Sequence, residues 1–502
     1  MAAQTQEIPL TAQQAEPDST PAPALPPISR KKQATVLLSA FVTIALTIGY
    51  NQCFGVFQEY YLSPSQDILA PGPAAQASPP TALLAFVGTL CYGLTWAGGL
   101  FVNPVISRIE HGTWAPTTTP STRLWRRRVL RLLRPRTITV SGVLLMTLGF
   151  ALASLGSSIW HLLLTQGFLV GLGMSLLYFP LLAPAPEYFN THRATAMGFV
   201  SISSAILFCS SSTGVTPQHA MSFGTQIEAI LAGGGAGGLI FSPVIRALLS
   251  SVGGRWTLRI YALFNLVAGL PTAWAVPRSR FAGASTAEGP ERRNTHVSRA
   301  LATQATFILS AVAAFLQAAG AQLPLSFIPS YTVILGLTAS NGANYLAASN
   351  AINAVSRVLT GYAGDRLGRQ NTLVLTLLLA AASVFAFWFS SVASSSLPLW
   401  LAFIALYSAS AGGYYALFPA LIAEVFGIRQ YAAVNAFILF VRGLGTMFGS
   451  PVGGQLLGSS EMGTAAYASI AYWDAALLMG ATACCIGVRW ADGKGKGWKW
   501  IA

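Results

Sequence analysis

Long apolar segments separated by short polar ones recur along most of the chain, from about residue 34 to near the C-terminus. A helix needs about 20 predominantly apolar residues to cross the roughly 30 Å hydrocarbon core of a bilayer. Only helices and closed barrels satisfy every backbone hydrogen bond inside that core. Segments of this length therefore predict membrane-spanning helices.

The pattern predicts twelve spans in two groups of six. The first six are expected at about 35–61, 82–106, 138–157, 160–183, 227–249 and 256–276, and the second six at about 302–335, 344–364, 373–392, 397–422, 432–457 and 467–489. We therefore predict an all-α polytopic membrane protein with two six-helix bundles, at 34–276 and 302–490. A disordered tail (1–33), a polar linker (277–301) and a second tail (491–502) complete the chain.

The two halves share sequence markers in the same order, as in transporters built from internal repeats. Glu187-Tyr-Phe corresponds to Glu424-Val-Phe, and Ser242-Pro-Val corresponds to Ser450-Pro-Val. These two markers are 55 residues apart in the first half and 26 apart in the second. The first half is therefore expected to carry extra residues.

Two insertions are expected in the first half, at about 117–136 and 200–228. We interpret the second as a retained intron or an error in the gene model, because it splits the fifth span. Sequencing the transcript tests this interpretation. If the segment is genuine, 196–211 is a candidate for a thirteenth span.

Composition and charge agree with a membrane protein. Only 9% of residues are charged, 53% are hydrophobic, and the mean hydropathy is +0.56. The net charge of +14 is scattered over short loops, which argues against a nucleic-acid partner and for the surface of a lipid bilayer. Basic residues near span ends are retained in the cytoplasm, so their positions predict cytoplasmic termini, and we expect the plasma membrane.

Motifs of enzymatic and metal chemistry are missing from the sequence. The five cysteines and five histidines have no disulfide or metal spacing. The sequence has no Walker lysine motif, HExxH or GxSxG, so we expect no enzyme and no cofactor, with proton coupling left open. The run GGGAGG at 233–238 lacks a βαβ context and is interpreted as close helix packing.

The stretch 350–369 contains the main candidate chemistry. A charge at the centre of a membrane helix costs about 2.5–3.5 kcal/mol, so Arg357 is expected to have a function. Asn353 and Asn350 lie four and seven residues before it and share its helix face. This face is expected to bind an anionic substrate. The alternatives are an arginine that snorkels from a helix end and asparagines that bond neighbouring helices.

Arg442 in the eleventh span is a second candidate, either as another anion contact or as the partner of a buried acid. Of the acids near spans, Glu59 and Asp474 are expected to lie too shallow to carry a proton. Polar and aromatic residues that could line a cavity include Asn51 and Gln317, together with Tyr50, Phe54, Gln58, Gln322, Tyr414 and Tyr415.

The sequence Gly361-Tyr-Ala-Gly-Asp-Arg-Leu-Gly-Arg369, between the eighth and ninth spans, resembles the loop signature of the major facilitator superfamily. The segments 49–61, Arg442-Gly-Leu-Gly and 449–454 look like those of fungal monocarboxylate transporters (monocarboxylate porters). The resemblance covers about 34–490 outside the insertions. It implies two bundles and alternating access between inward-open and outward-open states.

The resemblance also implies roles for individual residues. Acid-transporting members have a lysine on the first helix and an aspartate four residues before the eighth-helix arginine. Here the lysine is missing and Asn353 replaces the aspartate, so only Arg357 carries over. Conformational gating at the cytoplasmic face is expected from Gly361, Asp365, Arg366, Arg369, Arg108 and Glu424.

We expect a secondary active transporter that moves a small organic acid or acidic secondary metabolite as a monomer, by import or efflux. One alternative is efflux of a neutral or amphipathic compound, with Arg357 tied structurally to Asp474 or to a carbonyl. An alternative of another class is a receptor or sensor that does not transport.

Overall fold

The computed structural model describes residues 29–69, 81–110, 135–182, 223–276, 297–457 and 463–496, and almost all of them are helical. Ten segments of these ranges are long and apolar enough to cross a membrane. One of them, in α11 (Phe223–Trp274), is interrupted at Gly253, whose φ of 79° is not helical, and so provides two spans. The more polar α14 (Ala339–Leu367) is also long enough. The described residues thus form the twelve predicted spans.

The N-terminal bundle contains the first six spans. The first span is α1 (Arg30–Ile44), η1 (Ala45–Gly49), α2 (Tyr50–Gln52) and α3 (Phe54–Leu62), and the second is α4 (Thr81–Ala97) and α5 (Gly99–Glu110). The third is α7 (Pro135–Ala153), the fourth is α8 (Ile159–Leu162), η2 (Leu163–Leu169) and α9 (Val170–Leu182), and α11 provides the fifth and sixth.

The C-terminal bundle follows a short helix, α12 (Arg299–Ala302). Its spans are α13 (Ala305–Ile334), α14, the run α15 (Arg369–Ser383), η4 (Val384–Phe389) and α16 (Ser390–Ser394), then α17 (Leu397–Phe426), α18 (Ile428–Leu457), and η5 (Thr464–Tyr467) with α19 (Ala468–Lys496). Glycines with positive φ, Gly368 and Gly427, separate α14 from α15 and α17 from α18. The connections between the eighth and ninth spans and between the tenth and eleventh spans are therefore single sharp turns.

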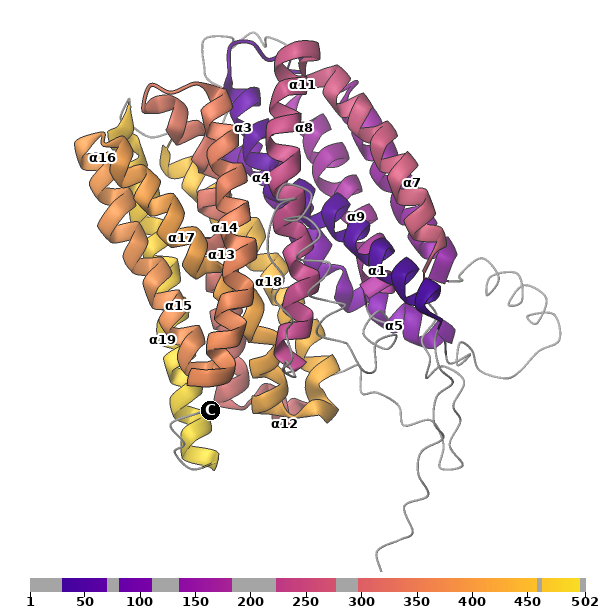
Figure 1. Cartoon of the computed structure of the whole chain (residues 1–502), viewed down its shortest axis with the longest axis vertical. Helices are drawn as coiled ribbons and strands as arrows, with labels where there is room; N and C mark the ends of the chain where they lie inside the picture. Colours follow the sequence, from indigo (N-terminus) through magenta and orange to yellow (C-terminus); the bar gives the residue numbers. More distant parts are fainter. Residues whose placement is uncertain are drawn as a thin grey trace, which may run out of the picture.

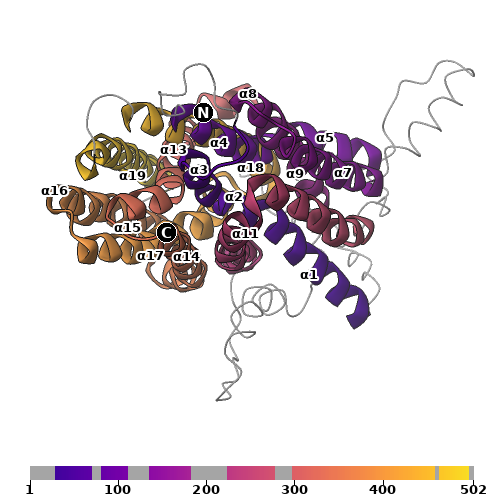
Figure 2. The ribbon, with the colours of Figure 1, turned by 90° about the horizontal axis from the view of Figure 1, so that it is seen from above.

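The two bundles stand side by side (Figures 1 and 2). Helix α4 packs along α18, and α11 packs along α14. Small residues permit this closeness: a Cβ added to Gly93 would come within 2.6 Å of the carbonyl oxygen of Gly443. The glycine-rich run permits close packing within the N-terminal bundle, because a Cβ on Gly237 would come within 2.9 Å of the Cα of Gly49.

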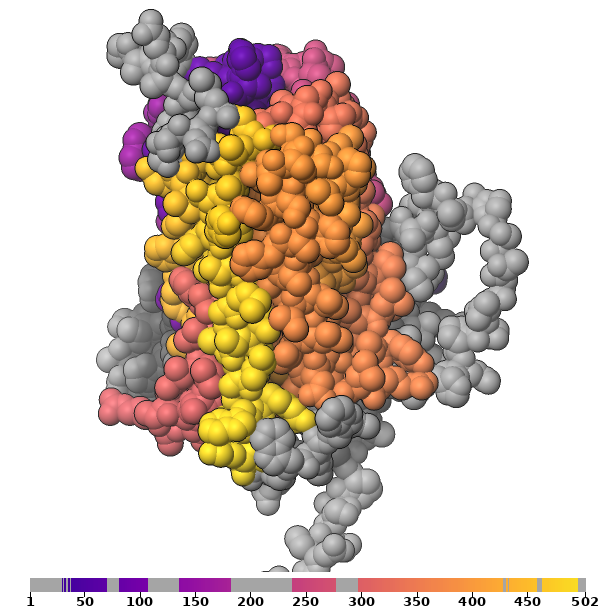
Figure 3. Space-filling view, turned by 90° about the vertical axis from the view of Figure 1, so that its left-hand side faces the viewer, coloured from indigo at the N-terminus to yellow at the C-terminus, as the bar shows by residue number. Residues whose placement is uncertain are grey.

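The outer face of the C-terminal bundle is apolar. Figure 3 shows this face, formed largely by the orange and yellow helices α15–α17 and α19. Large apolar side chains are exposed on these helices, including Leu375, Leu379, Phe385 and Ile486. A continuous apolar surface of this kind is covered by lipid in a membrane protein.

Several predicted features lie outside the described residues. These are nearly all of the insertions at 117–136 and 200–228, the marker at Glu187, both tails except their innermost residues, and most of the linker. The backbone of Arg108 belongs to α5.

Candidate site between the two bundles

Two buried arginines from different helices approach the same aromatic ring. The guanidinium carbon of Arg357, on α14, lies 4.6 Å from the ring centre of Tyr415, and that of Arg442, on α18, lies 4.7 Å from it. Arg357 is 1% exposed and Arg442 is 6% exposed. Tyr415 belongs to α17, so three helices of the C-terminal bundle bring two positive charges together. Neither arginine snorkels from a helix end.

Arg442 also contacts the other bundle. Its guanidinium lies 5.1 Å from the ring of Tyr414 and 5.5 Å from the ring of Trp96, which belongs to α4. Its Nε has no hydrogen-bond partner, and it forms no ion pair, within the part of the chain that the structure describes. Tyr92 of α4 and Tyr178 of α9 lie close enough to interact electrostatically with both arginines. The cluster of these two arginines and five aromatic residues is called the arginine–aromatic site.

The polar face predicted on α14 holds Arg357 in place. The Nε of Arg357 donates to Oδ1 of Asn353 at 2.9 Å, one helical turn away. Asn353 in turn donates to the carbonyl oxygen of Ser408 on α17 at 3.4 Å. Gly412 lets α14 and α17 approach, because a Cβ there would be 2.9 Å from the carbonyl oxygen of Asn353. Asn353 therefore positions the arginine and joins the two helices.

The other predicted substrate residues lie elsewhere in the core. Asn350 packs against Gly238, at the α11–α14 contact between the bundles, and its Nδ2 lacks a partner among the described residues. Asn51 donates to Sδ of Met174 at 3.2 Å and to the carbonyl oxygen of Thr47, both inside the N-terminal bundle. Gln317 is buried on α13. The structure thus brings Arg357, Asn353 and Arg442 together, and places Asn350, Asn51 and Gln317 in other contacts.

A network of charged side chains connects several helices at the end of the molecule that contains the C-terminus of α19. Arg369 contacts Asp365 at 3.3 Å and Glu424 at 3.8 Å. Gln370 donates to Glu424 and to Asp492 at 3.3 and 3.0 Å. These contacts join α14, α15, α17 and α19. The side chains of Arg369, Asp365 and Glu424 are about a quarter exposed, so each ion pair contributes little stability and can be exchanged at small cost.

Two of the residues predicted for gating are placed differently from Asp365 and Arg369. Arg366 lies 5.1 Å from the ring of Tyr362, an exposed residue of α14, and thus points along its own helix. Gly361 is buried in α14. Of the predicted set, Asp365, Arg369 and Glu424 therefore form ion pairs.

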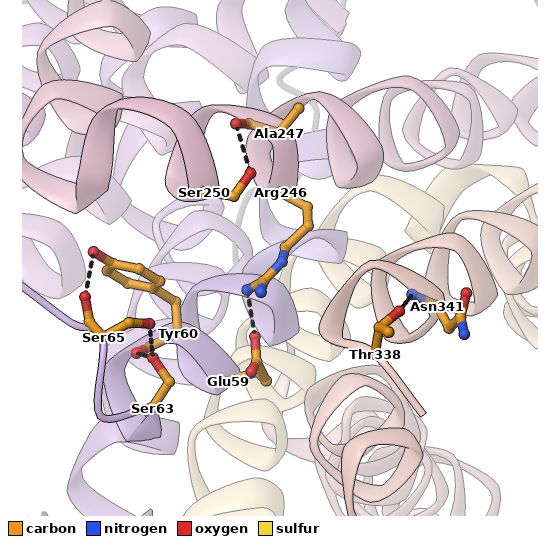
Figure 4. A network of polar contacts seen from close by, with 9 residues as sticks. All are labelled: Glu59, Tyr60, Ser63, Ser65, Arg246, Ala247, Ser250, Thr338 and Asn341. Atoms are coloured by element: carbon orange, nitrogen blue, oxygen red, sulfur yellow. Dashed lines mark hydrogen bonds and ion pairs between the residues drawn. The ribbon is translucent and has the colours of Figure 1, made fainter. Parts of the chain in front are cut away.

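The opposite end of the molecule contains a further ion pair. Glu59 of α3 and Arg246 of α11 point toward one another, 2.9 Å apart (Figure 4). The same view shows Thr338 capping the start of α14 by accepting from the backbone N–H of Asn341. Near this end α3 packs on α13 of the other bundle, where Gly55 lies against Pro329. The bundles are therefore in contact here.

Comparison with known proteins gives the family. The model of the Major Facilitator Superfamily matches residues 224–450 and 346–494, which together are more than half of the chain. The chain belongs to this superfamily. It is therefore a membrane transporter of small molecules and not an enzyme, in agreement with the sequence prediction.

Relatives of this facilitator include several fungal transporters. It is 25% identical to the MFS-type transporter pynF of Aspergillus niger over 83% of this chain and 79% of that protein. It is 24% identical to the Aspyridones efflux protein apdF of Emericella nidulans over 92% of this chain and 79% of that protein. Among solved structures, the D-xylose-proton symporter has a TM-score of 0.57 at 16% identity, over 94% and 98% of the two chains. The last comparison shows the fold.

The position of Asp474 differs from what the sequence indicated. It was expected to be a shallow acid or a partner of Arg357. It is fully buried, and neither carboxylate oxygen has a hydrogen-bond partner among the described residues. Asp474 is therefore not the partner of Arg357, which was one of the two partners, Asp474 or a carbonyl, that the alternative offered. It also lies beside Gly320, near the middle of α13, and so is deeper in the facilitator than its position early in the last span indicated.

Trp96 and its neighbour Tyr92 were not predicted as site residues from the sequence. Their rings are 5.9 Å apart, one helical turn from each other on α4. The signal was a pair of aromatic residues at i and i+4 inside an apolar span. Such pairs are also typical of packing, so only the contact with Arg442 identifies this one.

Proposed function

We propose that this facilitator transports a small organic acid or an acidic secondary metabolite, and that Arg357 and Arg442 bind its anionic group. The observation that supports this is the approach of two buried guanidinium groups to the ring of Tyr415 at the bundle interface. Buried charges are costly unless they are compensated, and Arg442 has no ion pair among the described residues. A bound carboxylate would supply the compensating charge.

The aromatic residues of the site favour a substrate with a flat apolar body. Trp96, Tyr414 and Tyr415 surround Arg442 with ring faces, and these faces can also stack on an aromatic or conjugated ligand. Because Trp96 comes from one bundle and the arginines from the other, a ligand here would contact both. That is the arrangement alternating access requires, since the site must open when the bundles rock apart.

The direction and the location of transport are also proposals. The relative named for aspyridones efflux favours export of a secondary metabolite. The basic residues near span ends favour cytoplasmic termini, which would place the network of Asp365, Arg369 and Glu424 on the cytoplasmic side. We propose that this network, with Gly361 and Arg366 of α14 and Arg108 of α5, changes its contacts as the plasma-membrane monomer changes state.

The test compares metabolites inside and outside cells with and without the gene. We expect an acidic compound to change its distribution in the deletion strain and wild-type expression to restore it. Arg357→Ala and Arg442→Gln should fail to restore it at equal surface expression. Arg259→Gln is the matched control, because Arg259 also lies over a tryptophan, Trp256, but on a span of the N-terminal bundle.

Two results would contradict the proposal. Full restoration by both arginine variants would remove these residues from the site. A change confined to neutral compounds would instead favour the efflux of uncharged or amphipathic molecules.

A further inference from the structure

A carboxyl group lies in the interior of the C-terminal bundle, away from the arginine–aromatic site. Asp474 of α19 has no exposed surface, and both of its oxygens lack a hydrogen-bond donor among the described residues. It faces Gly320 of α13, where an added Cβ would be 3.1 Å from Oδ1. Tyr407 of α17 interacts electrostatically with it. Three helices therefore enclose this side chain.

The group lies near the middle of the membrane. Gly320 is about halfway along α13, and Tyr407 is about a third of the way along α17. Both helices have 30 residues, so each end of α13 is about 20 Å from Gly320 at a rise of about 1.5 Å per residue. Bulk water at either surface is therefore distant from Asp474 in this conformation.

Among the described side chains, no positively charged group on the helices around Asp474 forms an ion pair with it. Helix α13 contains no charged residue, and its Tyr331 bonds with Ser391 toward the other end. On α15 the charged residue is Arg369, in the terminal network, and η4 has none. The remaining charged or titratable groups of the elements around Asp474 are Arg429, Tyr431 and Arg442 on α18, Tyr414, Tyr415 and Glu424 on α17, Tyr467 on η5, and Tyr472, Cys484, Cys485, Arg489, Asp492, Lys494 and Lys496 on α19.

Most of these groups are separated from Asp474 by their own contacts. Arg442 lies among the rings of Trp96, Tyr414 and Tyr415, and the ring of Tyr467 packs edge-to-face against that of Tyr331. Arg489 and the residues after it are at least 15 positions along α19, or about 22 Å. Tyr407 is therefore the titratable group in direct electrostatic contact.

An ionised carboxylate in such a place costs far more free energy than a neutral carboxyl, so the group takes up a proton instead. The close approach of Gly320 leaves little room for an organic cation beside Oδ1. A proton is the ligand that fits. On the same face of α13, one turn away, Gln317 is also buried with its Oε1 unbonded among the described residues, and could accept a hydrogen bond when the helices shift.

We propose that Asp474 is a proton-binding site that couples transport by this facilitator to the proton gradient. In the conformation described here the carboxyl group holds its proton. When α13, α17 and α19 part and water reaches it, the O–H bond breaks, the proton passes to water, and the carboxylate remains until it is protonated again. The coupling role rests on the transport function, whereas protonation of Asp474 does not depend on the identity of the substrate.

Infrared spectroscopy of the purified wild-type protein tests the protonation. We expect a C=O stretching band of a protonated carboxyl group at neutral pH, shifted by labelling aspartate with ¹³C. Asp474→Asn should remove the band. Glu59→Gln is the matched control and should keep it, because Glu59 pairs with Arg246. An aspartate band that is absent from the wild type, or that persists in Asp474→Asn, would overturn the proposal. Labelling needs no variant, so it decides even if Asp474→Asn does not fold.

Proteoliposomes with a trapped pH dye test the coupling. The probe is an organic-acid extract of the culture medium, with flux measured by mass spectrometry and proton movement by the dye. We expect Asp474→Asn to keep exchange of the transported compound while its proton movement falls to the level of empty vesicles. Wild-type proton movement in Asp474→Asn would refute the coupling. If no acidic compound is transported at all, the proposed substrate class fails, whereas the infrared result still stands.

Discussion

Replacing Tyr415 by leucine removes an aromatic ring that both buried arginines contact, at 4.6 and 4.7 Å. A cation–π contact contributes roughly 2 kcal/mol when both groups are desolvated and about half of that or less when exposed. Both arginines are almost fully buried, so losing two contacts should cost about 2–4 kcal/mol. Tyr415→Phe keeps the ring and should lose little of this energy.

Leucine is smaller than tyrosine, so Tyr415→Leu also loses packing energy, and this loss must be measured separately. Tyr467 provides the matched control: it is 1% exposed and packs on the ring of Tyr331 at 4.9 Å, with no arginine over it among the contacts of the described residues. The difference in unfolding midpoint between Tyr467→Phe and Tyr467→Leu measures the loss of aromatic packing alone. The corresponding difference between Tyr415→Phe and Tyr415→Leu should be larger, and the amount by which it is larger measures the lost cation–π contacts.

Thermal unfolding of the purified variants in detergent gives the numbers. For a unit of 150–250 residues, the size of one bundle, 1 kcal/mol shifts the midpoint by roughly 2–4 °C. The excess at Tyr415 should therefore be roughly 4–16 °C. Equal Phe-to-Leu differences at the two positions would refute the view that the ring of Tyr415 stabilises the two charges.

Three further predictions concern other parts of the molecule. Asp365→Ala should mainly slow turnover, because the network at the helix ends is proposed to exchange between states, and a change in substrate affinity alone would contradict a gating role. Glu59→Gln should leave the partly buried Arg246 without its 2.9 Å partner and lower the unfolding midpoint, whereas Glu59→Gln with Arg246→Gln should recover part of that loss. Gly237→Val should prevent the close approach to Gly49 and cost about 1–3 kcal/mol, seen as reduced thermal stability, and a wild-type midpoint would show that the helices can separate freely.

Much of the fold could be predicted from the sequence because span length and polarity are imposed by the bilayer itself. The break between the fifth and sixth spans was predicted at about 250–255, and Gly253 is where α11 leaves helical geometry. The eighth span was also predicted at about 344–364 and is α14. It is more polar than the other described spans, because one of its faces carries Asn350, Asn353 and Arg357.

The candidate site could be predicted only in part, because the relative height and rotation of helices are set by packing. Arg357 and Asn353 share one helix, so their contact followed from spacing. The approach of Trp96 to Arg442 depends on how α4 meets α18 across the two bundles. Asp474 was judged shallow from its distance to the start of its span, but packing places it opposite the middle of α13.

The polarity of α14 also has a consequence for how the protein is made. Ten other described segments are apolar enough to enter a membrane on their own composition, but α14 is not, and it contains a buried arginine. Its polar face is covered only when α11 and α17 lie against it, and α17 is synthesised later. During synthesis this helix must therefore be held near the membrane by its neighbours until the bundle closes. The helix that carries the proposed binding group is thus the one whose insertion depends most on the rest of the chain.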